Sequence, residues 1–232
     1  MHIPDGFIDV PVAAAAGVIA VVGIGVCLRR ASRELDDRTA PMAGLVAVYV
    51  FAVQMLNFPV AAGTSGHLLG GALAAILVGP YTGALAVSVV LSVQALMFAD
   101  GGLTALGLNI TNMAFVTVAV AWPVFRLLAR TLPRRRPAWT ASAFVAALLA
   151  VPAAALAFTA EYALGGAGTF TVGSVLTAMV GTHVLIGVGE AAITALTVGA
   201  VLAVRPDLVY GVRDLLPAPV LRVEDQPIGQ EV

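Results

Sequence analysis

Met1 and His2 are the residues whose types and order are best suited to bind a metal ion. The α-amine of Met1, the backbone nitrogen of His2 and an imidazole nitrogen can close around one cation in joined small rings. Nitrogen donors suit Ni(II), Co(II), Cu(II) and Zn(II), and a planar set of nitrogens favours Ni(II) or Cu(II). We expect Met1 to be retained, because its removal needs a small second residue. The competing interpretation is a tolerated histidine on a frayed chain end.

A second histidine, His67, stands in the stretch QMLNFPVAAGTSGHLLGG, residues 54–71. The proline at position 59 predicts the end of one helix, and nearby glycines permit a tight turn before the next helix begins. A histidine on that turn is a candidate fourth donor to the Met1-His2 chelate. The alternative is a histidine that only caps a helix start or faces water.

Polar residues at the same end of the predicted helices are candidates to support these ligands. Ligand histidines usually donate their second ring N–H to a carboxylate or a carbonyl group. Asp5 also fits a turn-capping role in Pro4-Asp5-Gly6, and Asp100 fits a loop cap equally well. The supporting candidates are Asp5, Asn57, Ser65, Asp100 and Asn109.

Four further polar residues fall inside apolar segments. Gln54 and Gln94 occupy matching places in a weak repeat, VQMLNF and VQALMF, and would hold the floor of the site if the repeat is real. His183 and Glu190 are seven residues apart, so they share one helix face. Three interpretations of that pair stay open: anchoring Asn109 and Asn112, supporting the metal site indirectly, or relaying protons.

The composition predicts an all-α, multi-pass membrane protein. Of the 232 residues, 60% are hydrophobic and 11% charged, and the mean hydropathy is +0.99. A spanning helix needs about 20 apolar residues. Seven ranges approach this requirement, although the third is short and the fifth opens with a polar stretch that predicts a broken or re-entrant turn. These ranges are 11–28, 41–59, 67–80, 82–99, 104–127, 138–160 and 172–204.

The basic residues predict the orientation in the membrane. All twelve are arginines, and they fall at the end of the fifth predicted span or after the first, fifth and seventh spans. The positive-inside rule then places the N-terminus outside and the C-terminus in the cytoplasm, in a bacterial cytoplasmic membrane. The outer end carries several acids and two histidines but no arginine, which favours an arriving cation. We predict one transmembrane metal-capture domain, 1–204, with its metal-binding segment at 1–10, and a cytosolic tail, 205–232.

Small residues recur at four-residue spacing in the third predicted span, at Gly71, Ala75 and Gly79. Such spacing lets another helix approach closely. Packing within the chain and docking against a coupling subunit are equally consistent with this pattern.

Four motifs together resemble the CbiM/NikM family, the substrate-capture subunits of energy-coupling-factor (ECF) transporters for cobalt and nickel. They are MHIPDG, LNFPVAAGTSGHLLGG, FADGGLTALGLNITNM and GTHVLIGVGEAAIT, and the resemblance covers roughly residues 1–204. It implies a seven-helix protein whose N-terminal segment inserts into the bundle. It also implies metal binding by the terminal amine, the backbone nitrogen and imidazole of His2, and His67.

The resemblance further implies partners. A transmembrane coupling subunit and two cytosolic ATPases would drive transport, and a small accessory membrane subunit is a further candidate. The chain itself has no G-x-x-x-x-G-K-[ST] motif, so we expect a non-catalytic subunit that does not bind nucleic acid. No permanent cofactor is expected, and the transported ion is Co²⁺ or Ni²⁺.

Two other classes of protein remain as alternatives. An intramembrane zinc enzyme is disfavoured, because the chain lacks H-E-x-x-H and has no three-ligand set on one helix. A stand-alone secondary transporter would be indicated by inverted repeats and paired broken helices, and only the short parallel repeat is present. The sequence does not separate cobalt from nickel, nor cobalamin synthesis from supply of a nickel enzyme.

Overall fold

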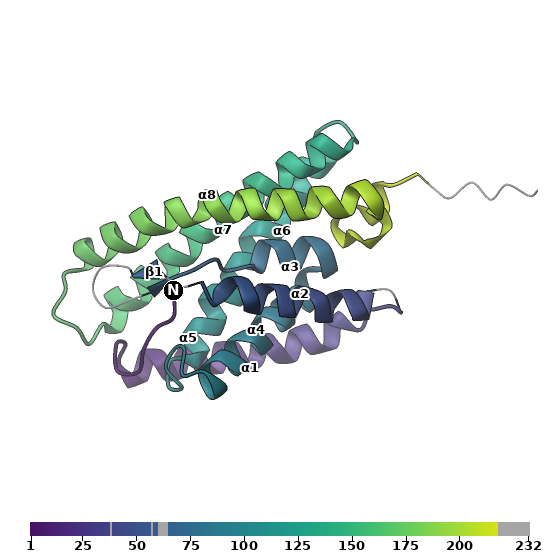
Figure 1. The fold of residues 1–232 in the computed structure, drawn as a ribbon. Coiled ribbons are helices and arrows are strands. Elements are labelled where there is room, and N and C mark those ends of the chain that lie inside the picture. Colours follow the sequence, from purple (N-terminus) through teal and green to yellow (C-terminus); the bar gives the residue numbers. More distant parts are fainter. Residues whose placement is uncertain (38, 57, 60–64, 218–232) are drawn as a thin grey trace, which may run out of the picture.

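The computed structural model describes residues 1–37, 39–56, 58–59 and 65–217, and these form a bundle of helices (Figure 1). Its helices are α1 Val10–Ala31, α2 Thr39–Gln54, α3 Gly71–Val78, α4 Pro80–Met97, α5 Leu106–Ile110, the π-helix η2 Thr111–Val116, α6 Thr117–Thr131, α7 Arg136–Gly165, α8 Val172–Val204, and the 3-10 helices η3 Pro206–Leu208 and η4 Tyr210–Leu215. Two-residue strands, β1 Phe58–Pro59 and β2 Ser65–Gly66, pair antiparallel. The prediction of an all-α fold is confirmed.

Five of the described helical segments are long and apolar enough to cross a membrane: α1, α4, the continuous run 106–131, α7 and α8. The shorter α2 is also apolar, with 16 residues. Each of the seven predicted ranges contains a helix, in the predicted order, while the number of crossings stays a prediction. The fifth range is a continuous helix with a π-helical turn at 111–116, so its predicted break is a local change of helix type.

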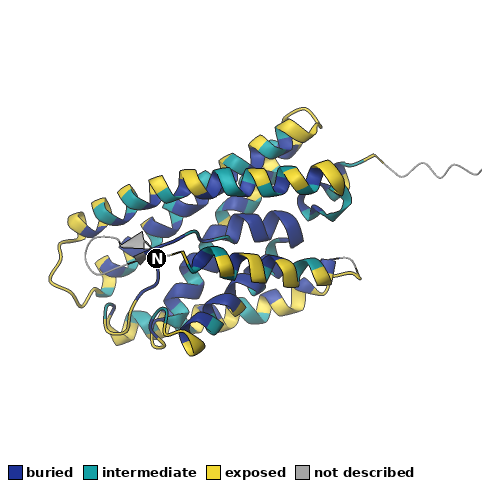
Figure 2. Cartoon of the chain, in the orientation of Figure 1, coloured by how far each residue is buried: buried dark blue, intermediate teal, exposed yellow. Residues whose placement is uncertain are grey.

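Helix α3 is short and lies inside the bundle. Its eight residues extend about 12 Å, well short of the roughly 30 Å hydrocarbon core. All eight are buried, so the helix has no exposed face (Figure 2). Glycines with positive φ stand on either side of it, Gly70 at 80° and Gly79 at 97°.

The small residues of α3 pack inside this chain. A β-carbon at Gly71 would overlap Thr117, and one at Gly79 would overlap Glu34. Ala75, between them, has no exposed surface. The intrachain interpretation of this stripe is therefore correct, and docking against another subunit through it is wrong.

The N-terminal segment, residues 1–9, enters the bundle beside β1 (Figure 1). Its inner part is buried at Met1, His2 and Ile3. Its outer part pairs with the chain after α7, where Ile8 bridges Gly166 and the Asp9 N–H donates to the Gly165 carbonyl at 2.7 Å. The Asp9 carboxylate then caps α1 by accepting from the Val12 N–H, as expected at a helix start. Burial thus fixes the start of this segment, and backbone hydrogen bonds fix its end.

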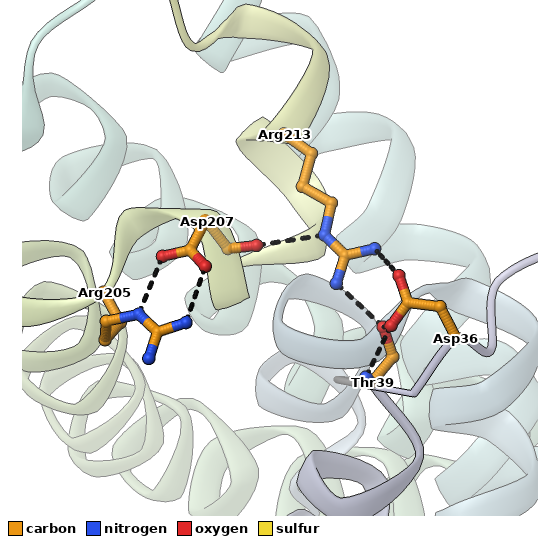
Figure 3. A network of polar contacts seen from close by, with 5 residues as sticks. All are labelled: Asp36, Thr39, Arg205, Asp207 and Arg213. Carbon is orange, nitrogen blue, oxygen red and sulfur yellow. Dashed lines mark hydrogen bonds and ion pairs between the residues drawn. The ribbon is translucent and has the colours of Figure 1, made fainter. Parts of the chain in front are cut away.

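Residues 206–215 fold back onto the opposite end of the bundle. Val209 and Val212 are fully buried there. The Arg213 guanidinium donates to Asp36 at 3.0 Å and to Thr39 at 2.8 Å, at the start of α2, while Arg205 pairs with Asp207 (Figure 3). This part of the predicted tail is folded, and it lies at the same end of the bundle as residues 32–37, which follow α1 (Figure 1).

Candidate metal site

His2 and His67 meet inside the bundle. Their rings are stacked, with centroids 4.5 Å apart and planes inclined by 29°. Both side chains are buried, although 65 residues of sequence separate them. The fold therefore brings together the two histidines that the sequence analysis singled out.

The ring of His67 is held in one tautomer. Its Nδ1 lies 2.8 Å from the Leu68 carbonyl oxygen, and since a carbonyl only accepts, Nδ1 carries the proton. The other nitrogen, Nε2, is buried and has no hydrogen-bond partner among the described residues. Burial, then the charge of the terminal amine and the nearby His2, lower the pKa of His67 well below its ordinary value. His67 thus presents a neutral nitrogen donor inside the protein.

The terminal amine of Met1 is buried as well. Burial lowers the pKa of this amine from 8.0 to about 4, partly offset by the charge of Asp100. A neutral amine has a free lone pair, which is the form that binds a metal ion. The amine also interacts electrostatically with His67, so it belongs to the same cluster.

Two side chains flank the His2 ring. His2 Nε2 lies 3.2 Å from the Gln94 side-chain oxygen, and His2 Nδ1 lies 3.2 Å from an oxygen of Asp100. The second pair is close enough for a charge interaction but is not aligned for a hydrogen bond. Gln94, predicted to form the floor of the site, does contact His2. Asp100 supplies a negative charge beside the amine and the imidazole.

The side chain of Asn109 forms two hydrogen bonds with the backbone of Ile3. The Ile3 N–H donates to the Asn109 side-chain oxygen at 2.8 Å, and the Asn109 amide donates back to the Ile3 carbonyl at 3.3 Å. Asn109 thereby fixes the residue that follows His2 rather than the ring of His2 itself.

The 98–105 loop fixes the rest of the segment. The Thr104 N–H donates to Asp5 at 2.8 Å, and the Gly102 N–H donates to the Ile3 carbonyl at 2.8 Å. Hydrogen bonds from Thr104 lower the pKa of the exposed Asp5. At Gly101, whose φ is 90°, a β-carbon would lie 3.0 Å from His2 Cδ2. The sequence analysis missed Gly101 and Thr104. The turn-prone DGG motif, residues 100–102, was a signal for Gly101 alone.

The segment from His67 to Gly70 is clamped from two helices. The amide of Gln54, on α2, donates to the Leu69 carbonyl at 2.6 Å. Glu190, on α8, accepts from the Leu69 N–H at 2.5 Å and from the Gly70 N–H at 3.0 Å. These three bonds fix the backbone that carries His67.

The remaining candidates divide into three groups. Asn57 and the side chain of Ser65 lie outside the described residues. Asn112 donates to Glu161 at 2.6 Å, so neither His183 nor Glu190 anchors it through a described hydrogen bond. His183 is buried on α8 and donates from Nδ1 to the Met179 carbonyl at 2.7 Å. Glu190 acts on the backbone next to His67, which favours indirect support of the site.

The site differs from a cluster of acidic and sulfur ligands. In the part of the chain that the structure describes, no three His, Cys, Asp or Glu side chains gather closely enough to hold a metal ion. The buried groups gathered at the N-terminus are two imidazoles and the Met1 amine. Such a set offers nitrogen donors only, which suits late first-row divalent ions.

Comparison with known proteins gives a consistent result. Residues 2–208 match the family model CbiM, described as the cobalt uptake substrate-specific transmembrane region. A protein of Archaeoglobus fulgidus, named as a fused nickel transport protein NikMN, is 45% identical over 156 residues, which are 67% of this chain and 50% of that one. Cobalt transport protein CbiM of a Roseiflexus species is 38% identical over 175 residues, 72% of this chain and 68% of its own.

A solved structure described as a transition metal transporter has the same fold. It superposes with a TM-score of 0.82 at 28% sequence identity, covering 94% of this chain and all of the other. The chain spans about half the length of the fused Archaeoglobus relative.

Proposed function

Because the chain belongs to the CbiM family of cobalt and nickel transport membrane proteins, we propose that it captures Co²⁺ or Ni²⁺ outside the cell for an ECF importer. The observation that carries this proposal is the burial of the Met1 amine beside the stacked rings of His2 and His67. Burying a charged terminal amine costs free energy unless a partner or the loss of its proton compensates, so a chain end buried in this way suggests a function.

The donor set in this proposal consists of four nitrogens. They are the Met1 amine, the backbone nitrogen and imidazole of His2, and the free Nε2 of His67. A planar arrangement of these donors suits Ni²⁺ well, and Co²⁺ also accepts nitrogen ligands. The outer end of the bundle, with Asp100 beside the site, would attract a cation.

Release of the ion to the cytoplasm needs partners in this proposal. Helix α3 begins four residues after His67, is apolar and is wholly buried, so a packed core lies next to the site. An ion passing through that core would lose its ligands without gaining others. We therefore assign the driving work to a transmembrane coupling subunit and two cytosolic ATPases, with a small accessory membrane subunit as a further candidate.

An uptake experiment tests this assignment against a stand-alone secondary transporter. Bacterial cells without their own uptake system would express the chain alone, the chain with the coupling subunit and ATPases, or the same set with the ATPase P-loop lysine replaced. We expect Co²⁺ or Ni²⁺ accumulation only with the intact set. Equal accumulation by the chain alone would instead identify a secondary transporter.

A further inference from the structure

A groove of about 450 Å³ lies between α1, α4 and α6, toward the end of the bundle away from the candidate metal site. Tyr81, at the start of α4, lines it, whereas Gln94, near the other end of that helix, contacts His2. The apolar residues that line the groove include Cys27, Ala84, Phe115, Val118 and Ala119. At the deep end α1 and η2 touch, because a β-carbon at Gly23 would overlap the ring of Phe115.

Aromatic rings with arginines against them lie at the mouth of this groove. The guanidinium of Arg30 lies 5.9 Å from the centre of the Tyr81 ring, and that of Arg126 lies 5.6 Å from the Trp122 ring. Both rings line the groove. Trp122 also packs against Tyr210, at 5.8 Å between ring centres, beside a second cavity of about 330 Å³. Tryptophan and tyrosine are enriched where a membrane protein meets the lipid headgroups, so the mouth of the groove has the composition of that level.

The charge at the mouth is positive. Arg126 pairs with both carboxylate oxygens of Asp214, and Arg130 lies 3.6 Å from the same carboxylate, so two arginines share one acid. The nearby carboxylate of Glu34 is buried and accepts from two backbone N–H groups at the start of α4. Arg30 is exposed and makes no ion pair among the described residues. Its charge is therefore available to an anion.

An anionic phospholipid matches both parts of this surface. One acyl chain suits the apolar lining, and the phosphate group suits the arginine at the mouth. A helix of another protein, about 10–12 Å across, fits poorly into a groove whose walls meet at Gly23 and Phe115, whereas a single acyl chain is narrow enough. The arginine distribution assigns this end to the cytoplasmic side, where membranes carry anionic lipids that basic pockets between helices bind.

We propose that this groove binds one anionic phospholipid, with an acyl chain along Phe115, Val118 and Trp122 and with its phosphate at Arg30. A lipid in this place contacts α1, α4 and α6 together, so it ties three helices to the membrane at one point. The inference does not depend on the proposed ion capture, because the groove shares no residue with the candidate metal site.

The test uses the full chain in nanodiscs of phosphatidylcholine that contain increasing fractions of phosphatidylglycerol with brominated acyl chains. Bromine quenches tryptophan fluorescence on contact. The chain has two tryptophans, and the background substitution Trp139→Phe leaves Trp122 as the reporter. The ring nitrogen of Trp139 has no described hydrogen-bond partner, so this change removes no described bond.

Two arginine variants are compared on that background, Arg30→Gln and the control Arg29→Gln. Arg29 is an exposed neighbour on the same helix and has no aromatic contact among the described residues. We expect quenching of Trp122 to saturate at a low fraction of phosphatidylglycerol. Arg30→Gln should raise the fraction needed for half-quenching about fivefold, the effect of one basic residue at an anionic membrane surface. Arg29→Gln should change it less than about twofold.

Three results would overturn the inference. Equal quenching by brominated phosphatidylcholine and phosphatidylglycerol would show ordinary contact with bulk lipid. An equal effect of the two arginine substitutions would show general attraction to the basic end of the protein rather than a site at Arg30. Absence of quenching by either lipid would show that acyl chains do not enter the groove, which would favour a protein segment as its occupant.

Discussion

At the residue scale, the terminal amine couples folding of the N-terminal segment to pH. Its pKa is 8.0 when free and about 4 when buried, so between these values the released segment binds a proton that the inserted segment does not. Stability therefore rises with pH across this window, by about 1.4 kcal/mol per pH unit. The contribution of the neutral amine is complete above pH 8 and is lost as the pH falls toward 4.

We predict that insertion of residues 1–9 in the ion-free protein weakens as the pH is lowered from 8 to 5. Hydrogen exchange of these residues, corrected for the intrinsic pH dependence of exchange, measures this change. Acetylation of the amine removes the titrating group, so the acetylated protein should show little pH dependence. The same pH dependence in both proteins would contradict the explanation.

Residue chemistry predicted the two histidines and several of their neighbours, but not which contacts those neighbours make. Met1, His2 and His67 were identified from donor type and from the turn before His67. The exposed Asp5–Thr104 contact and the grip of Asn109 on Ile3 depend on segments about 100 residues apart, which no local pattern specifies. For Glu190, the sequence indicated only a helix face shared with His183. Its hydrogen-bond partner is the Leu69 N–H, on the backbone just before α3.

At the scale of elements, the 67–70 segment depends on α8 for its position. Replacement Glu190→Gln puts an N–H₂ group where one oxygen now accepts, so one of the Leu69 and Gly70 N–H groups loses its partner. An unpaired buried donor costs about 1–3 kcal/mol. We expect a lower thermal midpoint and, since His67 is no longer fixed, a 10–100-fold weaker metal affinity.

Glu161→Gln is the matched control for that substitution. Glu161 lies on α7 and accepts from Asn112, and a glutamine oxygen can still accept that bond. Metal affinity should stay within about twofold of the wild type, because carbonyl and carboxylate oxygens both accept from an amide. An equal loss of metal affinity in both variants would show that the Glu190 contact has no special role.

A second prediction at this scale concerns the close packing around α3 and its contribution to stability. Gly71→Ala should destabilise the protein by about 1–3 kcal/mol, because the added methyl group overlaps Thr117. Gly189→Ala, on α8, meets nothing within 4 Å and should be neutral or slightly stabilising. Thermal midpoints in detergent measure both. If Gly71→Ala is as stable as Gly189→Ala, α3 is not packed as described.

The length of α3 shows that the helix in the third predicted range is shorter than the apolar run suggested. An apolar run of this kind has the composition of a spanning segment, and composition cannot distinguish burial in lipid from burial in protein. The positive φ values of Gly70 and Gly79 cut the run to eight residues. The longer helices were predicted well, because their length and apolar character point to the same structure.

At the scale of the whole molecule, the turns at 206–215 form part of the packed body. Val212→Ala should lower stability by about 1.5–3 kcal/mol, through lost burial and a cavity. Val204→Ala, at an exposed position near the end of α8, should have little effect. Thermal melting of the two variants checks this difference. Equal melting temperatures would mean that η4 does not contribute to the stability of the bundle.

The central claim concerns the chain terminus, and one titration tests it most directly. Native-terminus protein and a version with Met-Gly placed before Met1 are titrated with Ni²⁺ and Co²⁺, both carrying any purification tag at the C-terminus. We predict that the extension weakens binding by at least about 100-fold, since it removes a direct ligand rather than an outer-shell group. Equal affinity of the two proteins would contradict a metal site built on the Met1 amine and His2.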